Sequence, residues 1–361
     1  MIEIRVVKHE DEIEQLVELF RVSFGREVSK KFWEWKYINN PIASSSPEVI
    51  VACDGGKIVG ARPFLPTELR VNNEKILAAQ HCDTMVHPKF RNQGLFNRMG
   101  EYSLQYLKEH DYVLSYGFPG PMSRAGFLRQ GYRVVVPTEI MFRPINYQRI
   151  FSKKLNRDNL GSVLGYVCDK VIINKKRPVL KVDHIEVKIF DSYVQELEAI
   201  ESLKKTKVIE YVRGEKNLRW RFDQHPEHKY KYITATIDGT LYGYAVISVQ
   251  EQANGLNYGM IIDYVVKNEH PECFGALMEK AIIELAKTGC DLIMTWAFSE
   301  PGLKEELRKR FGFSSTSSFP YNRFIDPGYF EAISLNDQTM RGINIYDKNN
   351  WLITQIYPDY T

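Results

Sequence analysis

The chain has 361 residues, of which 44% are hydrophobic and 26% charged, and its formal net charge at pH 7 is +3. This composition is typical of a soluble globular protein, and the length is enough for two domains. Such a small net charge gives no reason to expect nucleic acid as a partner. No run approaches the roughly 20 apolar residues that a membrane-spanning helix needs, so we expect no membrane span.

The compartment follows from the N-terminus and the cysteines. The chain enters an alternating strand pattern at Ile2 with neither the basic nor the apolar region of a secretory signal, which indicates a cytoplasmic protein. Its five cysteines are odd in number and never spaced as CxxC. They therefore favour neither a disulfide framework nor a structural zinc site, and we expect no metal.

An internal repeat divides the chain. The segment 35–41 (WKYINNP) recurs as 220–226 (WRFDQHP), which keeps the tryptophan, cation, aromatic and proline in place. The strand-like segment 2–7 recurs at 185–190, and Asp83 recurs as Asp263. Such offsets indicate one fold used twice, and the recurrence of Trp35 as Trp220 favours a packing role for this pair. We predict domains at 1–145 and 184–325, a basic helical connector at 146–183, and a C-terminal tail at 326–361.

The segment 86–99 reads as a strand end, a tight loop and the start of an amphipathic helix. Gly94 allows a sharp turn, which leaves successive backbone N–H groups and a helix N-terminus facing one concavity suited to a pyrophosphate. The loop has neither the GxxxxGK[ST] nor the GxGxxG spelling. Residues 91–96 (RNQGLF), entered through His87-Pro88, resemble instead the Q/R-x-x-G-x-G/A acyl-CoA loop of the GCN5-related N-acetyltransferase (GNAT) superfamily. Phe96 stands where that family usually has Gly or Ala.

The resemblance implies a fold and a co-substrate. Each repeat reads strand, helix, helix, strand, strand, strand, helix, strand, helix, strand, so we expect an α/β chain with mixed sheets and two tandem GNAT folds. The second repeat looks degenerate, because Pro271 and Glu272 stand where N–H donors should face phosphates. The resemblance further implies that the first repeat binds an acyl-CoA, with acetyl-CoA expected. The residues expected to hold it are Met85, Val86, Arg91, Asn92, Gln93, Gly94, Leu95 and Phe96.

Direct transfer of the acyl group to an amine requires a base and can use an acid. The candidate bases are His81 and Asp83, which share one face of a strand because they are two residues apart; the recurrence of Asp83 in the second repeat favours a structural role. Many family members carry a tyrosine as the acid where this chain has Phe127. Tyr116 is the nearest replacement by position, and a thiolate can also leave unprotonated, since a thiol pKa lies near about 8.5.

The acceptor stays open. Amino sugars, polyamines, aminoglycosides and peptide N-termini all fit a small-molecule amine, and a homodimer is also left open. One alternative function is a non-catalytic acyl-CoA-binding or regulatory module. Another is an aminoacyl-tRNA-dependent transferase of similar tandem fold, against which the loop from Arg91 to Gly94 speaks.

Overall fold

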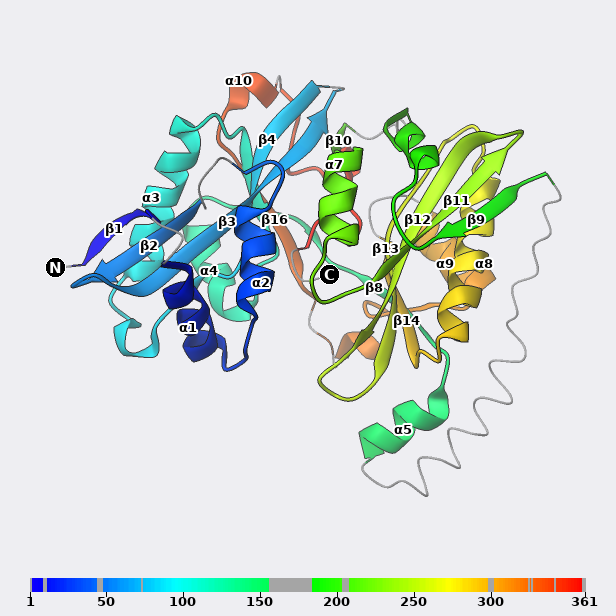
Figure 1. The fold of residues 1–361 in the computed structure, drawn as a ribbon, viewed down its shortest axis with the longest axis horizontal. Helices are drawn as coiled ribbons and strands as arrows, with labels where there is room; N and C mark the ends of the chain where they lie inside the picture. The colour runs from blue at the N-terminus through cyan, green and yellow to red at the C-terminus, as the bar shows by residue number, and fades with distance from the viewer. Residues whose placement is uncertain are drawn as a thin grey trace.

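A computed structural model of the chain describes residues 2–8, 12–43, 48–72, 74–155, 184–202, 208–297, 302–323, 325, 327–340 and 342–358. It contains two mixed β-sheets that lie beside each other, each covered by helices (Figure 1). The first sheet has the strand order β1-β2-β3-β4-β6-β16-β7, and the second has the order β15-β8-β14-β13-β12-β11-β9. The predicted α/β class with mixed sheets is confirmed.

The strands along the first sheet are β1 (Glu3–Val6), β2 (Val49–Asp54), β3 (Lys57–Val71), β4 (Glu74–His81), β6 (Leu114–Gly117), β16 (Tyr329–Ser334) and β7 (Arg133–Pro137). Three short strands attach to it: β5 (Met85–Val86), β10 (Ile209–Tyr211) and β17 (Trp351–Leu352). The second sheet consists of β15 (Ser314–Ser315), β8 (Ile140–Pro144), β14 (Leu292–Trp296), β13 (Asn257–Val266), β12 (Thr240–Glu251), β11 (Tyr230–Ile237) and β9 (Glu186–Phe190).

The α-helices are α1 (Glu12–Phe24), α2 (Lys30–Trp33), α3 (Leu95–Glu109), α4 (Pro121–Arg129), α5 (Tyr147–Leu155), α7 (Glu215–Leu218), α8 (Glu272–Lys287), α9 (Leu303–Phe311) and α10 (Asp337–Met340). The 3-10 and π turns are η1 (Glu34–Ile38), η2 (Pro88–Phe90), η4 (Gln195–Ser202), η5 (Arg219–Asp223), η6 (Tyr321–Arg323) and η7 (Lys348–Asn350).

Strand β2 shows how the first sheet is buried on both faces. Val49 and Val51 pack in one apolar cluster with α1, whereas Ile50 and Ala52 pack in another with α3. Successive side chains of a strand point to opposite faces, and here neither face is left for polar residues. The apolar run 49–52 is therefore what a strand covered by helices on both sides requires.

The two repeats meet at the tryptophans that the sequence pairs. The rings of Trp35, on η1, and Trp220, on η5, stack with centroids 5.1 Å apart. Each indole nitrogen donates to the other residue's carbonyl, at 2.8 Å for Trp35 and 2.9 Å for Trp220. A pair of reciprocal contacts is what a local two-fold relation between the repeats produces, and the packing role predicted for Trp35 is confirmed.

The repeats also exchange one strand each. β8, from the first repeat, lies in the second sheet between β14 and β15. β16, which follows the second repeat, lies in the first sheet between β6 and β7, where Figure 1 shows it in orange within the blue and cyan body. Each sheet is therefore completed by the other half of the chain.

The sequence intervals predicted for the domains stay a prediction, but the sheets cross their boundaries. β8 lies inside the interval 1–145 yet pairs in the second sheet, and the tail 326–361 supplies β16 and β17 to the first. Of the predicted connector, the structure describes α5 and the residues next to it, and 156–183 lie outside the described residues. Within the described ranges, no helix has the length and apolar character that crossing a membrane would require.

Candidate functional site

A cavity opens where β4 and β6 separate. The two strands run parallel and pair from Ala78 with Leu114 to His81 with Gly117. Beyond His81 the chain leaves this partner, and β5 pairs with β3 instead. The resulting cavity, about 730 Å³, is lined by residues 81–86 on one side and 117–121 on the other.

The predicted cradle forms one end of this cavity. Gly94 caps α3 in the left-handed region, at φ 72°, and Asn92 also has a positive φ of 63°. A Cβ atom at Gly94 would meet nothing within 4 Å, so this backbone faces open space. Because the first-turn amides of a helix have no partner within it, the start of α3 presents N–H donors and a positive dipole end to the cavity. This arrangement suits an anion such as a pyrophosphate.

The side chains of the loop have separate roles. Arg91 donates from Nε to the Val86 carbonyl and from a terminal nitrogen to the Ser23 carbonyl, both at 3.2 Å, and so joins β5 to α1 at the rim. Gln93 lies outside the cavity lining and donates to the Lys89 carbonyl at 3.4 Å. The other residues predicted to bind the co-substrate do line the cavity: Met85, Val86, Arg91, Asn92, Gly94, Leu95 and Phe96.

Phe96 departs from the family pattern, and its neighbour explains how it fits. A Cβ atom on Gly126 of α4 would lie 2.2 Å from the Phe96 ring, so only glycine leaves room there. The Phe96 ring meets Phe127 edge to face, with centroids 5.6 Å apart. Gly126 on α4 thus provides the space that the Phe96 ring occupies.

His81, at the end of β4, lines the cavity, and its side chain is deeply buried. Its ring lies 5.7 Å from those of Phe127 and Tyr132. Burial, together with the positive charge of Arg62, lowers the pKa of His81 well below its ordinary value. Arg62 itself is fully buried and stacks over the Phe127 ring at 4.6 Å. The imidazole is therefore neutral, and a second positive charge beside Arg62 is strongly disfavoured.

Asp83 also lines the cavity, but its carboxylate already has partners. Its Oδ2 accepts from Lys36 Nζ and from the Tyr37 hydroxyl, each at 2.6 Å. Burial would raise the pKa of Asp83, but Lys36 and Tyr37 outweigh burial and hold it below its ordinary value. A carboxylate in this state is a weak base. These contacts favour the structural role that the recurrence of Asp83 indicates.

Tyr116 does not line the cavity. Its side chain is fully buried on the opposite face of β6, and its hydroxyl donates to Thr67 Oγ1 at 3.2 Å. Burial raises the pKa of Tyr116 well above its ordinary value. The structure therefore brings His81 and Asp83 together at the cavity and leaves Tyr116 in the core between the two repeats.

Tyr132 and Glu331 are among the cavity residues that the sequence did not predict. Tyr132 contributes a buried ring, and Glu331 on β16 contributes a carboxyl group. The Gly-aromatic pair at 131–132 was a visible signal for Tyr132. No local signal pointed to Glu331, because it reaches this site through the exchanged strand.

At the corresponding place in the second repeat, the groups at the helix start bond to neighbouring residues. α8 begins at Glu272, whose carboxylate lies 2.9 Å from the His270 ring. The amides of Cys273 and Phe274 donate to the carbonyls of His270 and Pro271, each at 3.1 Å. The Tyr264 hydroxyl donates to the Trp296 carbonyl and so ties β13 to β14. These contacts agree with the predicted degeneracy of this repeat.

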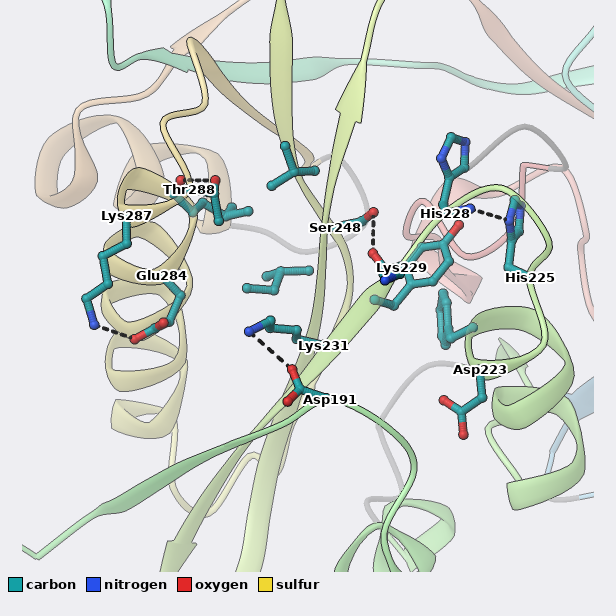
Figure 2. A pocket seen from close by; sticks show the side chains of 15 residues that line it. Asp191, Asp223, His225, His228, Lys229, Lys231, Ser248, Glu284, Lys287 and Thr288 are labelled. Atoms are coloured by element: carbon teal, nitrogen blue, oxygen red, sulfur yellow. Dashed lines mark hydrogen bonds and ion pairs between the residues drawn. The ribbon is translucent and has the colours of Figure 1, made fainter.

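A second cavity, about 830 Å³, lies in the second repeat beside the C-terminal end of α8 (Figure 2). Four of its charged side chains form two ion pairs: Lys231 with Asp191 at 3.1 Å and Lys287 with Glu284 at 2.9 Å. A helix C-terminus carries the negative end of the dipole. This cavity is therefore poorly suited to phosphates, and the first is the candidate active site.

Comparison with known proteins agrees with this geometry. Residues 3–135 match the family model described as an acetyltransferase (GNAT) domain. No curated protein matches the chain. Among solved structures, a GCN5-related N-acetyltransferase from Anabaena variabilis is similar with a TM-score of 0.62 at 10% identity, over 93% of this chain and 74% of that one.

Two further structures are also similar over both repeats. A tandem GNAT protein from the clavulanic acid biosynthesis pathway is similar with a TM-score of 0.58 at 15% identity, over 93% of this chain and 99% of that one. Saccharomyces cerevisiae N-myristoyltransferase with bound myristoyl-CoA is similar with a TM-score of 0.58 at 11% identity, over 92% of this chain and 82% of that one. Residues 3–135 are therefore a domain of the GNAT superfamily, and the chain is a tandem protein built on two copies of that fold.

Proposed function

We propose that the protein is an acyl-CoA-dependent N-acyltransferase, which binds acetyl-CoA in the first repeat and transfers the acetyl group directly to an amine. The observation that carries the proposal is the cavity between β4 and β6, which ends at the open N-terminus of α3. The diphosphate would lie against the amides at 92–96, and pantetheine would extend between the separated strands. Backbone N–H groups near Met85 and Val86 would polarise the acyl carbonyl.

The amine nitrogen attacks the thioester carbonyl carbon, the C–S bond breaks, and its electron pair leaves on the thiolate. The nitrogen gives up one proton. Rings from Phe127 and Tyr132 close the space around His81 beneath the split strands, which favours a short acyl group. The acceptor would enter beside residues 117–121, and we propose a small polar amine, with amino sugars among the first to test.

Calorimetric titration of acetyl-CoA into the wild type and Gly94→Trp tests the co-substrate site. The indole would project into open space in front of the amides, so we expect micromolar binding in the wild type and none in the variant. Gly56→Trp is the matched control, because Gly56 has a similar φ of 85° and open surroundings in the β2–β3 turn. No binding to the wild type, or equal binding to Gly94→Trp, would overturn the proposal.

A non-catalytic acyl-CoA-binding module is a second candidate. Phe127 favours it, because this cavity residue has no hydroxyl to protonate the leaving thiolate. Release of free thiol from acetyl-CoA, measured with glucosamine, spermidine and glycylglycine as acceptors, separates the two. Thiol release that depends on an amine supports the transferase, whereas binding without release supports the module.

A further inference from the structure

The exchanged strand β16 brings one carboxyl group into the first repeat's cavity. Glu331 lies opposite Gly117, the last residue of β6 before the strands separate. The pairing of β16 with β7 is irregular between Phe330 and Glu331, as in a β-bulge. A bulge re-aims side chains and is common beside active sites. Phe330 points into the core shared by the repeats, whereas Glu331 lines the cavity.

One oxygen of this carboxyl group is bound and the other is not. Glu331 Oε1 accepts from Arg124 Nε at 2.9 Å. Oε2 is buried and has no hydrogen-bond partner among the described residues. The side chain as a whole is only 1% exposed. An unpartnered buried carboxylate oxygen costs folding free energy. It is therefore a group whose partner is expected to come from a ligand.

We propose that Glu331 is the general base that accepts the proton of the acceptor amine. The proposal rests on the transferase function above. As the nitrogen–carbon bond forms and the carbon–sulfur bond breaks, the proton on the attacking nitrogen moves to Glu331 Oε2. The proton then passes to solvent or to the CoA thiolate, which restores the carboxylate.

The two bases suggested by the sequence are less suited to this step. Asp83 is held by Lys36 and Tyr37, and taking up a proton would break that ion pair. His81 would become an imidazolium beside the buried Arg62. Glu331 becomes neutral when it takes the proton, and burial raises its pKa while Arg124 offsets only part of that effect. The proton therefore finds its most favourable site at Glu331.

The variant Glu331→Gln tests this assignment, because glutamine keeps an oxygen for Arg124 and removes the base. We expect acetyl-CoA to bind within about twofold of the wild type, while kcat for thiol release falls by about 10²- to 10⁴-fold. Glu331→Asp should lose less, since it keeps a carboxylate. Glu210→Gln is the matched control and should leave kcat unchanged, because Glu210 is a buried carboxylate in the same sheet that is bound by Arg70 at 2.9 Å.

The pH profile gives a second readout. Wild-type kcat should rise as the pH increases through the raised pKa of Glu331, and this limb should be missing in Glu331→Gln. The other titratable or charged groups that line the cavity or contact its lining all remain in the variant, among them Arg26, Arg62, His81, Cys82, Asp83, Arg91, Arg124, Arg129 and Tyr132. Equal kcat values and equal pH profiles for the wild type and Glu331→Gln would overturn the assignment of the base but not the transferase function. Binding without any thiol release in the wild type would overturn the transferase function, and the base with it.

Discussion

The starts of α3 and α8 occupy equivalent places in the two repeats, but the first amides of α3 face a cavity, whereas two at the start of α8 donate to carbonyls of residues 270 and 271. At α3, Gly94 turns the chain so that the first-turn N–H groups point into open space. At α8, the carboxylate of Glu272 occupies the positive end of the helix and is hydrogen-bonded to His270. Two copies of one fold thus differ in the contacts that a few residues make at one helix terminus.

The second repeat nevertheless contributes to the first. It supplies half of the tryptophan contact and a large part of the core between the sheets, and the segment that follows it supplies β16. The cavity of the first repeat is therefore incomplete without residues from the second half of the chain. The comparison predicts that interface contacts matter equally from both sides, whereas changes at the two helix starts have unequal effects.

The largest effect should come from the contact that the repeats share. Trp35→Ala and Trp220→Ala each remove one stacked ring and one of two reciprocal hydrogen bonds, so each should lower the free energy of unfolding by about 3–5 kcal/mol. Chemical denaturation followed by circular dichroism measures this loss. Because the residues contact each other, the double variant should lose less than the sum. Strict additivity would show that the two rings do not meet.

The next largest loss of stability should come from the two aspartates at equivalent positions of the repeats, Asp83 and Asp263. Asp263 is completely buried and accepts two hydrogen bonds from Arg213, at 2.8 and 2.9 Å, so Asp263→Asn should cost about 3–5 kcal/mol of unfolding free energy. Asp83 has a 12% exposed side chain, and Asp83→Asn should cost less, on the order of 2 kcal/mol. Thermal denaturation of both variants compares the two. An equal loss would contradict the difference in burial.

The carboxyl groups of Asp83 and Asp263 should also make the folded protein less stable at acid pH. Burial raises the pKa of each, but Arg213 in one case and Lys36 in the other hold it below the ordinary value. A carboxyl whose pKa is lower in the folded state contributes stability above its unfolded pKa, and this contribution is lost as the pH falls through the folded value. Wild-type stability should therefore decline below about pH 4, and Asp263→Asn should show a weaker decline.

Sequence patterns predicted the features that depend on a few neighbouring residues or on the internal repeat. Gly94 and the helix after it identify the cradle because a loop and a helix start are contiguous in sequence. The recurrence of Trp35 as Trp220 identified the contact between the repeats. The sequence could not predict on which face of β6 the Tyr116 side chain lies. Alternation along a strand allows either face, and only the packing of the sheet decides between them.

Glu331 shows a different limit. Its place in the site depends on β16 pairing with β6, more than 200 residues earlier in the chain, and strand pairing at that separation leaves no local signature. The contacts of Asp83 and His81 likewise depend on Lys36 and Arg62, which belong to other elements. The role of a residue whose contacts come from distant segments can therefore be assigned only from the three-dimensional structure.

The smallest effect, and the most direct test of the two helix starts, comes from exchanging their charges. Asn92→Asp places a carboxylate at the position that aligns with Glu272, and aspartate tolerates the positive φ found there. Repulsion of the diphosphate should weaken acetyl-CoA binding about tenfold, or about 1.4 kcal/mol. Because the interaction is between partly exposed charges, added salt should reduce the difference. Isothermal titration at low and high ionic strength measures both effects.

Glu272→Gln is the reciprocal change, and it should create no second site. Removing the carboxylate leaves the amides of Cys273 and Phe274 still donating to the carbonyls of His270 and Pro271. Titration should therefore give one acetyl-CoA per chain in the wild type and in this variant. A stoichiometry of two would show that the charge of Glu272, and not the use of its neighbouring amides, is what separates the second repeat from the first.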